Sequence, residues 1–254
     1  MMKRFTYISI LILWGCDLGN IEGEELKGDF YIQDGWLAFS SEQYDEAENH
    51  FNTAFTLNKT NEEDSMYHYL AAIGLGWTDL YKARKDQEII PDGFVKSAGE
   101  HFDYVDSIIL LKESLLDSSF LDSTAKINLY AGLTFQRAYW AEQKEFNEKY
   151  WETTNLMLSG EIDILYRESI NFSFEVHDSY YFQYDTRVDY EDIILLRIEN
   201  YILIGDFNNA ISQFNEYENK FGFDCSQGTI NNFTIIDCLC EAANDGGCPG
   251  EELE

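Results

Sequence analysis

A small residue followed four positions later by an aromatic ring recurs along this chain of 254 residues. The pairs are Ala47 with Phe51, Ala98 with Phe102, and Ala210 with Phe214. A glycine-tryptophan step precedes the first two pairs, at Gly35-Trp36 and Gly76-Trp77, and Gly132-Leu133 is a fainter copy. Because a recurring unit of about 20–50 residues decides a whole fold, these echoes constrain the chain more than its composition does.

Residues four apart lie on one face of a helix, so each pair places a small side chain one turn before a ring. The small residue lets a neighbouring helix approach, and the ring fills the space beside it. Gly35 would serve the same purpose on the preceding helix. The pattern predicts antiparallel helix pairs stacked into a solenoid. An irregular helical bundle with chance pairs is the alternative, but the shared order of the motifs favours the solenoid.

These residues resemble the tetratricopeptide repeat family. The small and aromatic positions of one unit are filled by Gly35, Tyr44, Ala47, Phe51 and Ala54. A second clear unit has Gly205 in its turn and Ala210 and Phe214 in its second helix. The resemblance covers residues 28–220 and implies about four helix pairs, with the first helix of each pair lining a concave groove.

The two middle units match less well. One has its helices at 67–84 and 94–111, with a long connection around Pro91. The other has them at about 123–142 and 145–159, where Phe146 replaces the small residue.

Helix boundaries near the C-terminal unit are easier to predict. Asp189, with Asp192 three residues later, can cap a helix that begins at Tyr190, and Gly205 would end it.

Residues 171–186 break the helical period. Apolar side chains alternate there in two runs, Phe172, Phe174 and Val176, then Tyr180, Phe182 and Tyr184. Alternation is typical of strands, and a short polar link suits a turn, so we predict a β-hairpin inserted between the third and fourth helix pairs. Its aromatic face would pack on the solenoid, with a recognition arm as the alternative.

The N-terminus has the order of an export signal. Lys3 and Arg4 precede an apolar run at 5–14, which is too short for a stable membrane span. Leu13, Gly15 and Cys16 resemble the lipobox of bacterial lipoproteins. The alternative is an ordinary secretory signal.

The lipobox resemblance implies that residues 1–15 are removed, that Cys16 carries lipid, and that 16–27 form a tether. The chain would then be anchored to a membrane by lipid alone, with the periplasmic face of the outer membrane as the expected location. Asp17 leaves the inner membrane open, because an aspartate after the lipidated cysteine retains some lipoproteins there.

The charge balance excludes some partners. The chain has 17 basic and 47 acidic residues, a formal charge of −30. Such a field repels nucleic acid and anionic lipid headgroups. It favours a partner with a basic surface, or it simply keeps an exported protein soluble. The acids do not form a calcium-binding loop.

No catalytic motif, cofactor motif or metal-ligand spacing is found. The histidines are scattered, at His50, His68, His101 and His177, and we expect structural roles for them. Four cysteines gather in the acidic tail at 221–254: Cys225, Cys238, Cys240 and Cys248. In an exported protein this number favours two disulfides, with Cys238 to Cys240 the least attractive pairing. Free thiols and a zinc site remain alternatives.

The leading functional hypothesis is a non-enzymatic, membrane-tethered scaffold that binds a protein partner in its groove. Trp36, Phe39 and Trp77 are the candidate contacts, although aromatic residues at such positions more often belong to the core. The second hypothesis is capture of a solute such as a glycan, because some tetratricopeptide-like lipoproteins serve nutrient uptake. An enzyme is third. A stripe of exposed rings would favour the first hypothesis, and a compact polar-rimmed pocket the second.

Overall fold

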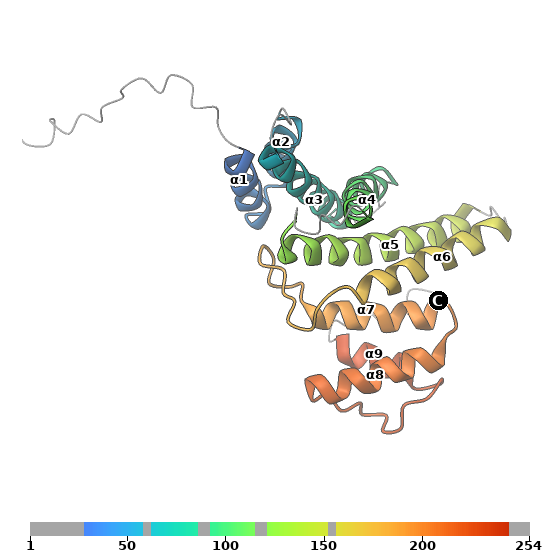
Figure 1. The fold of residues 1–254 in the computed structure, drawn as a ribbon. Coiled ribbons are helices and arrows are strands. Elements are labelled where there is room, and N and C mark those ends of the chain that lie inside the picture. Colours follow the sequence, from blue (N-terminus) through green and yellow to red (C-terminus); the bar gives the residue numbers. More distant parts are fainter. Residues whose placement is uncertain (1–27, 58–61, 86–91, 115–120, 152–155, 244–254) are drawn as a thin grey trace, which may run out of the picture.

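The computed structural model describes residues 28–57, 62–85, 92–114, 121–151 and 156–243. Within these ranges the chain forms nine α-helices and no β-strand beyond a single isolated bridge, so the all-helical expectation is confirmed there (Figure 1). The helices are α1 (Gly28–Ser40), α2 (Tyr44–Thr56), α3 (Glu62–Lys85), α4 (Asp92–Ser114), α5 (Ser123–Trp151), α6 (Leu156–Ser173), α7 (Tyr190–Leu203), α8 (Phe207–Phe221) and α9 (Ile235–Ala243).

Each helix from α1 to α8 packs against the next helix in the chain. The helices α1, α3, α5 and α7 also contact one another in that order, and we call them the first helices. Within the described ranges the second helices, α2, α4, α6 and α8, do not contact one another. The pairs therefore follow one another from α1 and α2 to α7 and α8, as Figure 1 shows from top to bottom.

Phe51 of α2 fills the contact between α1 and α3 and is completely buried. A Cβ atom added at Gly35 of α1 would lie 2.6 Å from its ring, and one added at Gly74 of α3 would lie 2.5 Å away. Carbon atoms in contact are about 3.5–4.0 Å apart, so only glycine allows this approach. Ala47 and Ala54 of α2 are also buried.

Phe102 of α4 repeats this arrangement one pair later. It is completely buried, and a Cβ atom added at Gly76 of α3 or at Gly132 of α5 would lie 2.5 Å from its ring. Each of these two rings thus holds its own first helix against the next one. The glycine positions that recur in the sequence are explained by this contact.

The helix boundaries predicted around α7 are confirmed. The Asp189 side chain accepts a hydrogen bond from the Glu191 N–H at 2.7 Å, and the Asp192 carboxylate accepts one from the Asp189 N–H at 2.8 Å. The two bonds form a capping box. Gly205 follows the end of α7 with a φ of +74°. Helices α7, α8 and α9 share a second hydrophobic cluster that includes Phe214 of α8.

The expected boundary within the third pair is wrong. Helix α5 continues to Trp151, so Phe146 lies inside it with 54% of its side chain exposed, and α6 begins only at Leu156. Residues 141–148 contain no glycine or proline and are mostly strong helix formers, which is why the helix does not end at 142.

The β-hairpin expected at 171–186 is not present. Residues 171–173 are the end of α6, so Phe172 lies within a helix. Phe172 and Val176 are four residues apart, a spacing that suits a helix as well as a strand, and the helical reading prevails.

Only residues 180–182 of the second alternating run are extended, since Tyr184 lies in a turn, and their partner is different from the one expected. The Phe182 N–H donates to the Val188 carbonyl at 2.8 Å, and the Tyr190 N–H donates to the Tyr180 carbonyl at 3.0 Å. Tyr180 and Phe182 are buried, whereas Tyr181 between them is 67% exposed. The alternation therefore marks one extended segment, paired with the residues just before α7.

Several predictions lie outside the described residues: the signal peptide at 1–15, lipidation of Cys16, the tether at 16–27 and any disulfide of Cys248. They stay predictions. No described helix is both long and apolar enough to cross a membrane.

Candidate functional site

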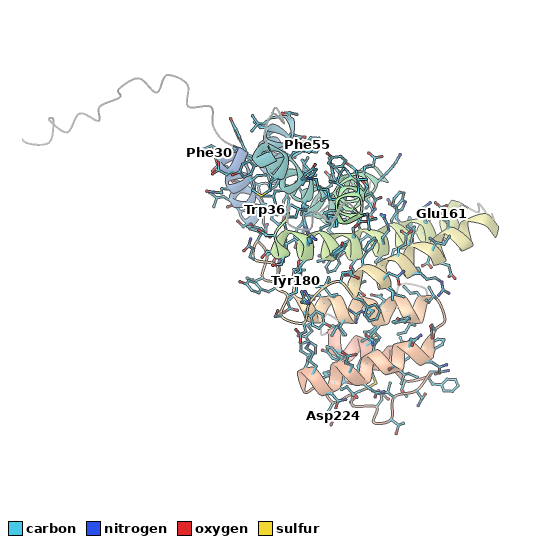
Figure 2. The ribbon with its side chains drawn as sticks, in the orientation of Figure 1. Phe30, Trp36, Phe55, Glu161, Tyr180 and Asp224 are labelled. Carbon is cyan, nitrogen blue, oxygen red and sulfur yellow. A yellow bond between two sulfur atoms is a disulfide. The ribbon has the colours of Figure 1, made fainter. Side chains whose placement is uncertain are left out.

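The segment 174–189 between α6 and α7 lies on the first helices, and we call it the aromatic loop. Its Phe182 is completely buried and stacks on Trp77 of α3, with ring centroids 4.3 Å apart. The same ring meets Trp36 and Phe39 of α1 edge to face, each at 5.8 Å. Figure 2 labels Trp36 on α1 and Tyr180 near the start of the loop. The loop thus fills the space between α1 and α3.

The three residues predicted to contact a partner are all buried. Trp36, Phe39 and Trp77 are 7%, 2% and 1% exposed, and the Trp77 indole N–H donates to the Asn128 carbonyl at 3.0 Å. In this structure they are core residues, the alternative that the sequence left open. A partner would reach them only if the aromatic loop moved.

Asp185 fixes the far end of the aromatic loop. It accepts hydrogen bonds from the Tyr81 hydroxyl of α3 at 2.7 Å and from the Arg187 side chain at 2.7–3.1 Å. Burial alone would raise its pKa, but the bonds from Arg187 and Tyr81 outweigh that effect and lower the pKa to about 2. The carboxylate is therefore ionised at neutral pH, and both of its oxygens are already in use.

A cleft of about 450 Å³ opens beside the aromatic loop on the first-helix side of the array. It extends from the turn between α1 and α2, across α3 and α5, to the start of α7. We call it the tyrosine cleft. Its lining residues are Glu42, Tyr44, Tyr81, Arg84, Phe135, Tyr139, Asp185, Arg187, Val188 and Asp192.

Arg84 is an exposed cation that lines the tyrosine cleft. Its guanidinium lies over the Tyr139 ring, 5.9 Å from the centroid, and it forms no salt bridge with any carboxylate in the part of the chain that the structure describes. By contrast Lys82, Arg137 and Arg187 each hold one or two carboxylates. An unpaired arginine is notable in a chain where acids outnumber bases so strongly.

The carboxylates near Arg84 are partly desolvated. Burial raises the pKa of Asp192 to about 6. Burial and the neighbouring Glu199 raise the pKa of Glu142 to about 8, so Glu142 is mostly neutral at pH 7. Burial also raises the pKa of Tyr139 to about 12. Arg84 opposes these shifts but does not cancel them.

A larger hollow of about 610 Å³ lies over α4, α5 and α6 and includes Leu110, Ser123 and Tyr130. Leu110 and Ser123 flank residues 115–120, which are outside the described ranges. We take the tyrosine cleft as the candidate site because charged groups from α3, α7 and the aromatic loop converge in it.

The histidines have structural surroundings. His68 Nδ1 donates to the Phe55 carbonyl at 2.5 Å, and Nε2 shares a hydrogen bond of 3.0 Å with the Tyr104 hydroxyl. His101 Nε2 lies 3.8 Å from the buried Asp79. Across the described ranges, no group of three or more His, Cys, Asp or Glu side chains is arranged to hold a metal ion.

A disulfide joins Cys225 and Cys238, whose Cα atoms are 5.3 Å apart, and ties the loop after α8 to α9. Cys240 is disulfide-bonded as well. Both Cys225 and Cys238 are buried in the cluster shared by α7, α8 and α9. The bond therefore links the loop after α8 covalently to α9 at the C-terminal end of the array.

Arg84 and Tyr139 are two of the site residues that the sequence reasoning missed. Arg84 lies seven residues after Trp77, so it shares the helix face on which a groove residue was expected. Tyr139 follows Gly132 by seven residues in the same way. A helical projection of 77–84 and of 132–139 would have placed Arg84 and Tyr139 on the face where groove residues were expected.

Comparison with protein-family models, with curated proteins and with solved structures found no match for this chain.

Proposed function

We propose that this chain is a non-enzymatic, lipid-tethered scaffold of the cell envelope, built as a tetratricopeptide-like array, that binds a protein partner on its first-helix face. The observation that carries the proposal is the order of contacts among α1, α3, α5 and α7, which places one face of four helices in a continuous row.

The glycine and phenylalanine contacts support the repeat assignment. The same contact, a phenylalanine ring between two glycines, occurs twice in succession. Phe51 lies between Gly35 and Gly74, and Phe102 lies between Gly76 and Gly132. Repeat arrays are built from such nearest-neighbour joints, and their continuous faces serve as binding surfaces.

The tyrosine cleft is a polar concavity on the first-helix face. Ligand sites are concave, with apolar walls and a few convergent polar groups. Rings of Tyr44, Phe135 and Tyr139 meet charged groups there, as a partner-binding site requires.

The charge indicates the kind of partner. Loss of Lys3 and Arg4 with the signal peptide would take the formal charge from −30 to −32. A field of this sign speeds the approach of a basic surface at low salt and slows that of nucleic acid.

The anchor is proposed from the sequence at Cys16. Replacing Cys16 with serine should abolish fatty-acid labelling and release a soluble or unprocessed chain. Unchanged labelling of the variant would exclude this anchor.

Affinity capture tests the binding role. The lipidated protein would be captured from native envelopes after crosslinking, beside a Tyr44→Ala/Tyr139→Ala variant and an Ile164→Ala control, whose side chain is exposed on α6. We expect the partner to be lost with the cleft variant alone. Equal recovery with both variants would place the partner elsewhere.

Solute capture is the second candidate, because partly buried rings line a compact cleft with a charged rim rather than an exposed stripe. The rim carries both acids and arginines, which suits a ligand whose groups both donate and accept. Tight binding of a neutral oligosaccharide by the purified chain, with no crosslinked protein partner, would favour this function over the first.

A further inference from the structure

The tyrosine cleft has unused hydrogen-bond donors. A guanidinium carries five N–H donors, and those of Arg84 meet only the Tyr139 ring within the described ranges. Tyr139 also lines the cleft, and its hydroxyl forms no hydrogen bond with another described residue.

Some acceptors of the cleft are already engaged. Asp185 receives the Tyr81 hydroxyl, the Arg187 side chain and the Arg187 N–H. One oxygen of Asp192 caps α7 by accepting from the Asp189 N–H. Glu42, at the rim, lies 3.8 Å from Arg187. A ligand that enters therefore finds donors to satisfy.

We propose that Arg84 anchors a carboxylate of the ligand bound in the tyrosine cleft, with the Tyr139 ring beside it as an apolar wall. This inference rests on the proposed function, because it assigns a ligand group to the same site. A partner that is basic overall would then present one carboxylate at this point.

The charges of the cleft favour a carboxylate over a phosphate. The planar fork of arginine matches both anions with two parallel bonds. A phosphate brings close to two negative charges, which Glu42 and Asp192 would repel about twice as strongly as one. The single charge of a carboxylate matches the single charge of Arg84, which pairs with no carboxylate among the described residues.

Two sources of carboxylate can be separated with matched probes. Trigalacturonate and galactotriose differ by their acid groups, as do the capped dipeptides acetyl-Tyr-Glu-amide and acetyl-Tyr-Gln-amide. Binding to the full chain would be measured by calorimetry, and modification of Arg84 by phenylglyoxal would be followed by peptide mass spectrometry.

We expect one acid probe to bind at least about tenfold more tightly than its neutral counterpart and to protect Arg84 from phenylglyoxal. Arg84→Gln should remove that preference, and Arg84→Lys should retain part of it. The control Arg167→Gln, which changes an exposed side chain of α6, should leave the preference unchanged. The acid probe that binds identifies the source.

Equal binding of acid and neutral probes, a preference that survives in Arg84→Gln, or Arg84 left unprotected by every probe at millimolar concentration would overturn the inference. The proposed function fails separately. If Tyr44→Ala/Tyr139→Ala loses the captured partner while Arg84→Gln keeps it, the face binds but the carboxylate anchor is wrong.

Discussion

Trp36 and Tyr184 stack face to face, with ring centroids 4.0 Å apart and ring planes 2° from parallel. One ring belongs to α1 and the other to the aromatic loop, so a segment that follows α6 in the chain closes over the first helix of the array. Phe182, two residues earlier, lies on Trp77 of α3. The loop therefore holds the first two helix pairs to the third and fourth.

The aromatic loop should contribute strongly to stability. Phe182→Ala removes a completely buried ring and should lower the free energy of unfolding by about 3–5 kcal/mol, measured by urea denaturation. The neighbouring Tyr181→Ala, at an exposed position, should change it by less than about 0.5 kcal/mol. Similar losses for both variants would mean that the loop does not lie on α1 and α3 as described.

Two glycines in helices should respond to alanine in opposite directions. Gly76→Ala places a Cβ atom 2.5 Å from the Phe102 ring and should destabilise the protein by about 1–3 kcal/mol. Gly160→Ala in α6 meets nothing within 4 Å and should stabilise it by about 0.5–1 kcal/mol through helix propensity. Thermal unfolding measures both, and a stabilising Gly76→Ala would contradict the joint between α3, α4 and α5.

Stability should fall as the pH rises from 5 to 8. Burial raises the pKa of Glu142 from 4.5 to about 8, so between those values the folded chain binds this proton more tightly than the unfolded chain. Burial raises the pKa of Asp192 and of Asp79 from 3.8 to about 6. These two groups therefore also lower the stability as the pH rises, but between those lower pH values. Burial lowers the pKa of His101 below its usual value of 6.5, so this group makes the stability rise with pH below pH 6.5.

Glu142→Gln isolates this effect. It should remove the loss of stability between pH 6 and 8, on the order of 2 kcal/mol, whereas Glu175→Gln at an exposed position should keep it. Urea midpoints across the pH series give the measurement. Parallel curves for the wild type and Glu142→Gln would show that Glu142 is not the group responsible.

Reduction of the Cys225–Cys238 disulfide should loosen only the C-terminal end. A crosslink across a sequence separation of 13 stabilises a chain by about 3 kcal/mol. Hydrogen exchange should speed up in α9 and in the loop after α8. Helices α1 to α5 should stay protected, because their hydrophobic cluster is distinct from the one shared by α7, α8 and α9. Faster exchange in α3 after reduction would disprove this independence.

The sequence predicted the parts of the fold that depend on local spacing. Ala47 and Phe51, four residues apart, and the Asp189 cap are read directly from the chain, because helix faces and helix starts are set within one turn. The end of α5 was missed because residues 141–148 carry no helix breaker, so only tertiary contacts decide where the helix stops.

The aromatic loop and the site were harder to predict. Alternation at Tyr180 and Phe182 indicates an extended segment but does not say what it pairs with, and the partner proved to be Val188 rather than the run at 171–177. The rings of Trp36 and Trp77 lie on the expected face. That the loop covers them, leaving Arg84 and Tyr139 accessible, follows from contacts between distant parts of the chain.

A photo-crosslinking scan tests the central claim, binding on the first-helix face, most directly. A photoreactive phenylalanine analogue would replace Tyr44, Arg84 or Tyr139 around the tyrosine cleft, and Leu110, Ile164 or Phe233 at exposed positions elsewhere. In native envelopes we expect the same partner to be crosslinked from all three cleft positions and from none of the others. Crosslinks to one partner only from α4, α6 or the C-terminal loop, with none from the cleft, would contradict the account.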